Sequence, residues 1–294
     1  MVGTRLISSS FALSLAFISE GFPLWALYAA EEQLFFVKGG LDIEVIHTGS
    51  SVKQVEGLES GLYDLGLQLP DHVIRSVEKG SDLCIVAAQA HAPDVALVAD
   101  PQILDLDKLM GKSIGVDGAR TGYALLLTRL LYKAGWKEKD FVLTEIGGTT
   151  ERIEALETGV ISACFVNPPF DQFLIKQGFV RLASTRESFP EYPGPVVAGR
   201  RSWIDRHRDV VDRFIDAWRN AFCWLTDVRN RETAIQIACA RLNVSVESAA
   251  QAFDELGERG IPEVTIEGLE AVIDLVWKGK ESDRSRPDPA RYLL

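Results

Sequence analysis

Along most of the chain, short apolar runs alternate with amphipathic stretches of helical length. Residues 23–36 carry apolar side chains at helical spacing, with a proline in the first turn and a Gly-Gly pair as a stop. Residues 41–47 then alternate in the manner of a strand. Because this succession continues to about residue 185, it predicts parallel βαβ units with right-handed crossovers.

One segment of the pattern occurs twice. Residues 49–71 (GSSVKQVEGLESGLYDLGLQLPD) and 147–169 (GGTTERIEALETGVISACFVNPP) share a glycine turn, a helix, a second glycine and a buried strand that ends before proline. The repetition predicts two similar α/β lobes. Helix starts present unpaired N–H groups, so we expect the turns at 49–51 and 147–150 to face each other across a cleft and hold a polar or anionic solute.

The pattern changes after residue 185. Residues 189–203 are rich in Pro and Gly with one short strand-like run, and helical spacing dominates from there on. A helical third without a sheet must pack on a lobe already made, and we expect the first. The predicted organisation is lobe 1 over residues 1–92, lobe 2 over 93–194, and a mostly helical return to lobe 1 over 195–294.

The first 21 residues have two possible interpretations. One arginine followed by a weakly apolar stretch is compatible with a signal peptide. Ser8, Ser9, Ser10 and Ser14, together with the lack of a small-x-small cleavage site before Glu20, favour a first strand and its loop. The protein is then expected to be periplasmic if a leader has been trimmed, or cytoplasmic as the chain is written.

Composition excludes some classes of protein. The chain has 294 residues, enough for about two domains, and a net charge of −11, which argues against a nucleic-acid partner. Its four cysteines are far apart in apolar surroundings and are expected to be buried thiols. No apolar run is long enough to cross a bilayer, and neither a metal nor a cofactor is expected.

The stretch PLWALYAAEEQLFFVKGGLDIEVIHTGSSVKQVEGLESGLYDLG (23–66) resembles the N-terminal lobe of type II periplasmic solute-binding proteins, closest to ABC-importer receptors for sulfonates, taurine, nitrate and hydroxymethylpyrimidine thiamine precursors. Residues 109–118 (LMGKSIGVDG) resemble the family's entry into its second lobe. The sequence departs from the family pattern at Glu32-Gln33-Leu34, because members of the family usually have a turn of a charged residue and a glycine there. The matching positions are Leu24, Ala29, Phe35, Gly40, Leu41, Asp42, Glu44, Gly49, Ser50, Leu58, Ser60, Gly61 and Asp64.

The resemblance implies two α/β lobes joined by a two-strand hinge, a ligand in the cleft between them, and closure on binding. The expected partners are a small molecule and an ABC permease, and the expected state is a monomer. The function that follows is capture of a small polar, anionic organic solute, a carboxylate or sulfonate, for import.

The loop GVDGARTGYALL (115–126) carries the strongest candidate contacts. Gly122 gives backbone freedom at a helix start, Thr121 offers a hydroxyl, and Arg120 can pair with a carboxylate, sulfonate or phosphate. The spacing fits neither a Walker loop nor a dinucleotide fingerprint. The alternative is an ordinary tight turn with a solvated Arg120.

Other candidates come from lobe edges. Ser9, Ser10 and Phe11 are expected to follow the first strand, and Trp25 opens the first helix, so all four can line the cleft, with core packing as the alternative. Gln68 and Asn167, at the ends of the two repeated strands, can orient a ligand or bond a turn. His91 precedes the lobe crossing and Tyr192 lies on the return crossing; each can contact ligand or simply pack.

Two alternatives to a transport receptor stay open. Some decarboxylases and enzymes of pyrimidine-precursor or menaquinone synthesis have this fold, and Asp64, Asp117 or Glu145 can serve as acid or base. The sequence has no nucleophile elbow, metal cluster or cysteine-rich iron motif, so enzyme activity is the less favoured interpretation. A ligand sensor that acts through a protein partner is the third possibility.

Overall fold

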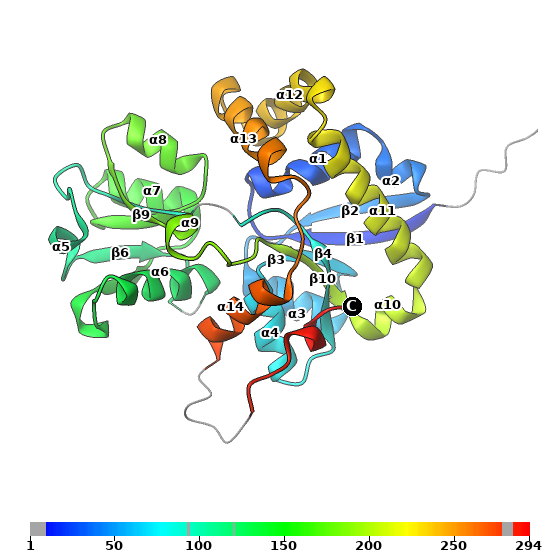
Figure 1. The fold of residues 1–294 in the computed structure, drawn as a ribbon, viewed down its shortest axis with the longest axis horizontal. Coiled ribbons are helices and arrows are strands. Elements are labelled where there is room, and N and C mark those ends of the chain that lie inside the picture. Colours follow the sequence, from blue (N-terminus) through cyan, green and yellow to red (C-terminus); the bar gives the residue numbers. More distant parts are fainter. Residues whose placement is uncertain (1–9, 93–94, 120, 278–284) are drawn as a thin grey trace, which may run out of the picture.

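The computed structural model describes residues 10–92, 95–119, 121–277 and 285–294. These form two α/β lobes, each around a five-stranded sheet, with a group of C-terminal helices over the first (Figure 1). The predicted fold class is therefore confirmed.

Lobe 1 contains the sheet with strand order β2-β1-β3-β10-β4. β1 is parallel to β2 and β3, whereas β10 runs antiparallel between β3 and β4. Its strands are β1 (Phe11–Phe17), β2 (Leu41–His47), β3 (Leu65–Gln68), β4 (Leu83–Ala88) and β10 (Val196–Arg200).

Lobe 2 repeats this plan with strand order β7-β6-β8-β5-β9. β6 is parallel to β7 and β8, and β5 runs antiparallel between β8 and β9. Each strand of lobe 1 thus has a counterpart in lobe 2, as the duplicated segment predicts. The strands are β5 (Ala96–Ala99), β6 (Ser113–Val116), β7 (Val142–Glu145), β8 (Ala163–Val166) and β9 (Val180–Ser184).

The chain crosses between the sheets after β4 and again after β9. The helices of lobe 1 are α1 (Trp25–Glu32), preceded by the 3-10 turn η1 (Phe22–Leu24), then α2 (Phe35–Lys38), α3 (Ser51–Ser60) and α4 (Pro70–Glu78).

The prediction of a single helix over 23–36 is wrong, because Leu34 takes a left-handed conformation with φ 58° and divides the segment into two helices. Ser50 caps α3 through a bond from Lys53 N. Gly61, the second glycine that the two repeated segments share, ends the helix at φ 83°, as predicted.

Lobe 2 carries a corresponding set of helices. They are α5 (Leu106–Leu109), α6 (Gly122–Lys133), the 3-10 turn η2 (Glu138–Asp140), α7 (Thr149–Glu157), α8 (Phe170–Lys176) and α9 (Thr185–Ser188). By position after equivalent strands, α6 corresponds to α1, α7 to α3 and α8 to α4.

The C-terminal part is helical, as predicted. It consists of α10 (Arg201–Arg206), α11 (Arg208–Leu225), η3 (Val228–Asn230), α12 (Arg231–Leu242), α13 (Val246–Arg259), α14 (Ile266–Val276) and η4 (Pro289–Tyr292). α11 and α12 lie against α1 of lobe 1 (Figure 1). α14 instead packs on both α4 and α6 and so touches both lobes.

The hydrophobic core follows this division. One cluster joins the sheet of lobe 1 to α1 and α11, where the rings of Phe36, Phe214 and Trp218 pack together. A second cluster is shared by the lobes: it includes Val73 of α4, Leu127 of α6 and Leu269 of α14. The space between the lobes is therefore partly filled by apolar packing.

Two expectations about particular residues are corrected. Ser10 and Phe11 do not follow the first strand, because β1 begins at Phe11. Of the cysteines, Cys84 and Cys164 are buried as expected, and burial raises their pKa values to about 11 and about 12. Cys223, however, is exposed on α11, and Cys239 of α12 is only partly buried.

Candidate functional site

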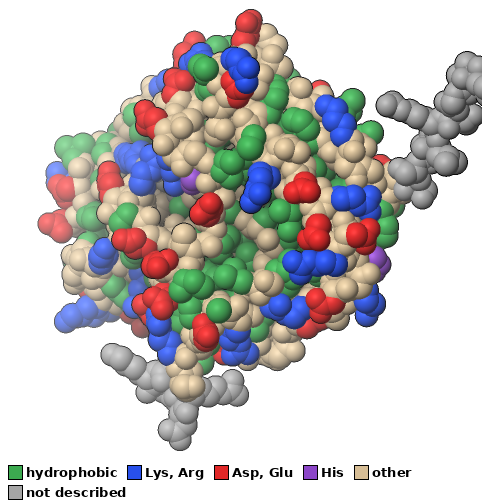
Figure 2. Space-filling model, turned by 45° about the vertical axis from the view of Figure 1, so that its right-hand side comes forward, with side chains coloured by type: hydrophobic (Ala, Val, Ile, Leu, Met, Phe, Trp, Pro, Cys, Tyr) green, Lys and Arg blue, Asp and Glu red, His purple; other side chains and the backbone are tan. Residues whose placement is uncertain are grey.

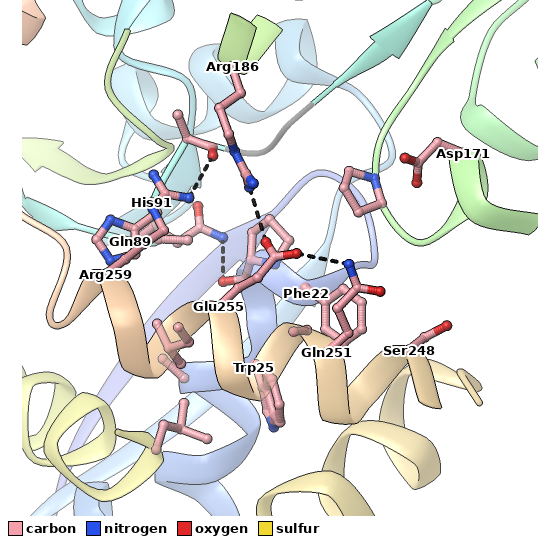
Figure 3. A pocket seen from close by; sticks show the side chains of 18 of the residues that line it. Phe22, Trp25, Gln89, His91, Asp171, Arg186, Ser248, Gln251, Glu255 and Arg259 are labelled. Atoms are coloured by element: carbon pink, nitrogen blue, oxygen red, sulfur yellow. Dashed lines mark hydrogen bonds and ion pairs between the residues drawn. The ribbon is translucent and has the colours of Figure 1, made fainter. Parts of the chain in front are cut away.

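A cavity of about 170 Å³ lies between the lobes, beneath α13. Lobe 1 contributes the start of α1, lobe 2 contributes the start of α8 with parts of β9 and α9, and the C-terminal region contributes α11 and α13. The first crossing contributes Gln89 and His91, which are drawn with Arg259 at the left of the view (Figure 3).

One wall of the cavity is apolar. Phe22 and Trp25 present neighbouring rings with centroids 5.7 Å apart, and Phe222 and Leu225 of α11 lie beside them. The indole of Trp25 is held in place because its Nε1 donates to the carbonyl of Ala234, 3.1 Å away. Such a fixed surface suits the flat or apolar body of a small molecule.

The opposite side of the cavity is polar and links lobe 2 to α13. Arg186 Nη2 lies 3.1 Å from Glu255 Oε2 (Figure 3). Gln172 Nε2 donates to Gln251 Oε1 at 3.1 Å, and Ser248 Oγ donates to Gln172 Oε1 at 3.3 Å. These contacts cross the cleft, so they must break when the lobes separate.

The charged side chains that line the cavity belong mostly to lobe 2 and α13. Asp171, the second residue of α8, is almost fully buried, and Arg181 Nη1 from β9 lies 3.5 Å from its Oδ2. Arg259, at the end of α13, donates to the carbonyl of Ala92. Over the described residues, three arginines and two carboxylates line the cavity.

His91 ties the first crossing to the end of α13. Its Nε2 lies 2.8 Å from the carbonyl oxygen of Gly260, which can only accept, so this nitrogen carries the proton. Burial, together with the charges of Arg259 and Arg186, lowers the pKa of the ring. Gln89 secures the other end of the crossing by donating to the carbonyl of Pro23 at 3.2 Å.

A second group of polar side chains lies where α4 meets α6. Asp71 of α4 is only 1% exposed, and its Oδ1 would be 2.4 Å from a Cβ atom at Gly122, the first residue of α6. The side chains of Tyr123 and Asn167 share a hydrogen bond. Burial raises the pKa of Tyr123 and, with the nearby Asp71 charge, that of Tyr192. Tyr123 and Tyr192 also border a cavity of about 30 Å³.

The sequence-predicted residues divide between these two places. Trp25 and His91 line the larger cavity, and Gly122, Asn167 and Tyr192 belong to the group around Asp71. That they bind a ligand stays a prediction. Ser9 and Arg120 lie outside the described residues.

Gln68 and Thr121 have distinct surroundings. Gln68 ends β3 almost fully buried, and neither its Nε2 nor its Oε1 has a hydrogen-bond partner among the described residues. Thr121 caps α6: its hydroxyl donates to Asp117 Oδ1 at 2.7 Å and accepts from Ala124 N. Its hydroxyl is thus already engaged within its own loop.

Ser10 and Phe11 lie at the amino end of β1, whereas the cavity lies beyond the carboxyl end, and the ring of Phe11 packs on His207 at 5.5 Å. The turns at 49–51 and 147–150 do not border the cavity either. They follow the edge strands β2 and β7, whereas α1 and α8, which do border it, follow strands inside the sheets.

Sequence reasoning missed most polar residues of the cavity. Asp171 is the second residue of α8, as Asp71 is of α4, but the sequence repeat places Asp71 opposite Pro169, so this equivalence became visible only in the structure. Gln251, Glu255 and Arg259 come from α13, and nothing in their local pattern indicated a position at the cleft.

Acidic and basic side chains are interspersed over the face shown in Figure 2. Within the described ranges, no group of three or more His, Cys, Asp and Glu side chains could hold a metal ion. In the same part of the chain, no helix has the length and apolar character needed to cross a membrane.

Several solved structures share the fold of this chain. The alkanesulfonate-binding protein SsuA from Xanthomonas axonopodis pv. citri, bound to MOPS, superposes with a TM-score of 0.77 at 16% identity, covering 98% of this chain and 99% of that one. The periplasmic aliphatic sulphonate binding protein SsuA from Escherichia coli superposes with a TM-score of 0.75 at 18% identity, covering 96% of this chain and 92% of that one. The periplasmic nitrate-binding protein NrtA from Synechocystis PCC 6803 superposes with a TM-score of 0.70 at 17% identity, covering 83% of this chain and 70% of that one.

No curated protein matches the sequence significantly. The family model described as NMT1/THI5 like matches residues 23–228, more than half of the chain. The predicted resemblance to periplasmic binding proteins is confirmed at the level of fold. The chain belongs to the NMT1/THI5-like family.

Proposed function

We propose that this protein is the substrate-binding component of an ABC-type importer, and that it captures one small organic solute in the cavity between its lobes. The observation that carries this proposal is the composition of the cavity wall: lobe 1, lobe 2, the first crossing and α13 all contribute. A solute held there would touch both lobes at once, so its binding would favour the form in which the lobes lie close together.

The shape and lining of the cavity favour a compact solute with an apolar body. Its volume of about 170 Å³ is below the roughly 300–1,000 Å³ typical of drug-sized ligands. The body would lie on Phe22 and Trp25. The contacts made by Arg186 and Gln172 with α13 would then re-form over it.

The charges favour an anionic head group. Among the described lining residues the arginines, Arg181, Arg186 and Arg259, outnumber the carboxylates, and the starts of α1 and α8 point their positive dipole ends toward this region. Guanidinium groups bind carboxylates and sulfonates through paired hydrogen bonds. Two structural relatives are described as sulfonate-binding and one as nitrate-binding, which agrees with this class.

Closure would be the signal to a permease. A solute that binds the closed form more tightly shifts the population toward it by its differential affinity. We propose a monomer whose two crossings act as the hinge. We also propose that it works in the periplasm, as do the sulphonate-binding protein from Escherichia coli and the nitrate-binding protein from Synechocystis that share its fold.

The test is calorimetric titration and thermal unfolding with taurine, linear alkanesulfonates, MOPS, nitrate and small carboxylates. One compact monoanion is expected to bind one to one and to raise the unfolding temperature, and Arg259→Gln is expected to weaken it about tenfold or more. Binding only by neutral or cationic compounds would contradict the anionic class. Native mass spectrometry after incubation would reveal a converted molecule if the protein were an enzyme.

A further inference from the structure

The two halves of the interlobe cleft are built from equivalent parts. α4 follows β3 in lobe 1, and α8 follows β8, the strand in the equivalent position of the lobe 2 sheet. Asp71 and Asp171 are the second residues of these helices, and both are nearly fully buried, with 1% and 3% of their surface exposed. Each lies beside an arginine of its own lobe, Arg75 and Arg181 respectively.

What faces each aspartate differs between the halves. Asp171 borders the larger cavity, whose opposite wall is the start of α1 with the indole of Trp25. Asp71 faces the start of α6, the helix equivalent to α1, where the first residue is Gly122. One helix start thus carries a ring that lines a cavity, whereas the other has no side chain and is closely approached by Asp71.

The closed half has no room for a solute. A Cβ atom at Gly122 would lie 2.4 Å from Asp71 Oδ1 and 2.9 Å from its Cγ, so not even a methyl group fits between them. Asp71 Oδ1 is buried and has no hydrogen-bond partner among the described residues. Its carboxylate lies beside Gly122, the first residue of a 12-residue helix whose positive end attracts anions.

We infer that Asp71 is a specificity-determining residue that fills the anion position at the start of α6 with the chain's own carboxylate. The solute is thereby confined to the half beside Trp25, and a second anionic group at the α6 end is excluded by both volume and charge. The claim that the solute is confined to one half rests on the proposed function. The claim that Asp71 occupies the anion position at the start of α6 is independent of that function and can be tested separately.

The test uses inorganic sulfate and the full-length protein. Calorimetric titration at low ionic strength should show that Asp71→Ala binds one additional sulfate, at least tenfold more tightly than the wild type does at this position. Gly122→Ala in the Asp71→Ala background should abolish the gain, because the methyl group returns bulk to the start of α6. Should Asp71→Ala fail to fold by circular dichroism, Asp71→Ser replaces it with the same expectation.

A control variant is needed because Arg75, which lies next to the removed carboxylate, could itself bind sulfate. The additional sulfate binding should persist in Asp71→Ala/Arg75→Gln if the start of α6 holds the sulfate. Equal sulfate binding by wild type and folded variant, loss of the gain with Arg75→Gln, or a gain that Gly122→Ala leaves unchanged would each overturn the inference. If the proposed transport function were wrong, no organic solute would bind, yet the sulfate result would stand.

Discussion

Arg186 on α9 of lobe 2 and Glu255 on α13 form an ion pair across the cleft, with Nη2 and Oε2 3.1 Å apart. Both side chains line the larger cavity, and both are partly exposed, at 46% and 40%. The pair therefore has two roles in the proposed function. It is one of the contacts that must break on opening, and it neutralises an arginine next to which an anionic solute would lie.

Removing the carboxylate should strengthen anion binding. Glu255→Gln keeps the shape of the side chain but leaves the positive charge of Arg186 less compensated, so the affinity for a monoanionic solute should rise several-fold at low salt, and less at high salt. Because the pair is partly exposed, the free energy of unfolding should change by less than about 1 kcal/mol. Calorimetric titration at two salt concentrations measures the first effect.

Glu258→Gln is the matched control, since Glu258 is exposed on the same helix and does not line the cavity. It makes the same change in net charge. An equal gain in affinity from both variants would show that overall charge, rather than the position of Glu255, is responsible.

Trp25 should affect both stability and binding. Trp25→Phe keeps an aromatic ring in the wall but leaves the buried carbonyl of Ala234 without its indole donor, at a cost of about 1–3 kcal/mol. The solute should also bind more weakly, because the wall loses surface. Trp136→Phe, in the lobe 2 core and away from the cavity, should lower stability without changing solute affinity. Urea unfolding and calorimetry together separate the two effects.

Gly122→Ala should hold the lobes apart. The added methyl group meets Asp71 of the opposite lobe at 2.4 Å, and overpacking of this kind costs about 1–3 kcal/mol. That cost falls on the closed form alone, so solute affinity should fall about tenfold and small-angle scattering should show a larger radius of gyration.

Gly257→Ala serves as the comparison for Gly122→Ala. Gly257 lies in α13, and a Cβ atom there would meet nothing within 4 Å. Alanine in a helix is more favourable than glycine by about 1 kcal/mol, so this variant should be as stable as the wild type or more so, with an unchanged radius of gyration. A scattering curve for Gly122→Ala identical to that of Gly257→Ala would contradict the proposed clash.

His91 should make stability depend on pH. Burial, and then the charges of Arg259 and Arg186, hold the pKa of His91 in the folded protein below its ordinary value of 6.5. Above pH 6.5 the ring is neutral in both the folded and the unfolded chain. As the pH falls below 6.5, the unfolded chain takes up a proton that the folded protein resists, so the free energy of unfolding decreases.

The measurement is urea unfolding at pH 7.5 and pH 5.5. His91→Gln, whose amide can still donate to the carbonyl of Gly260, should lose less stability between these two values than the wild type does. The difference between the two proteins isolates His91 from the other groups that titrate in this range. Identical losses would show that the ring protonates freely in the folded state.

The sequence alone determined the elements and the plan of the fold. The periodicity of apolar positions located the strands and most helices, because burial of one face repeats at a fixed spacing. Ser50 and Gly61 marked the ends of α3 through local capping chemistry. The duplicated segment predicted two similar lobes, and the two sheets indeed share one strand order.

Only the tertiary structure decided which side chains meet between the lobes. Asp71 and Gly122 belong to different lobes, and α13 reaches the cavity from a part of the chain that follows both sheets. Leu34 breaks the first helix, and the turns of the repeat lie at sheet edges. A local pattern reports whether a position is buried, whereas contact across a cleft depends on how distant, already folded segments pack, and no spacing along the chain encodes that.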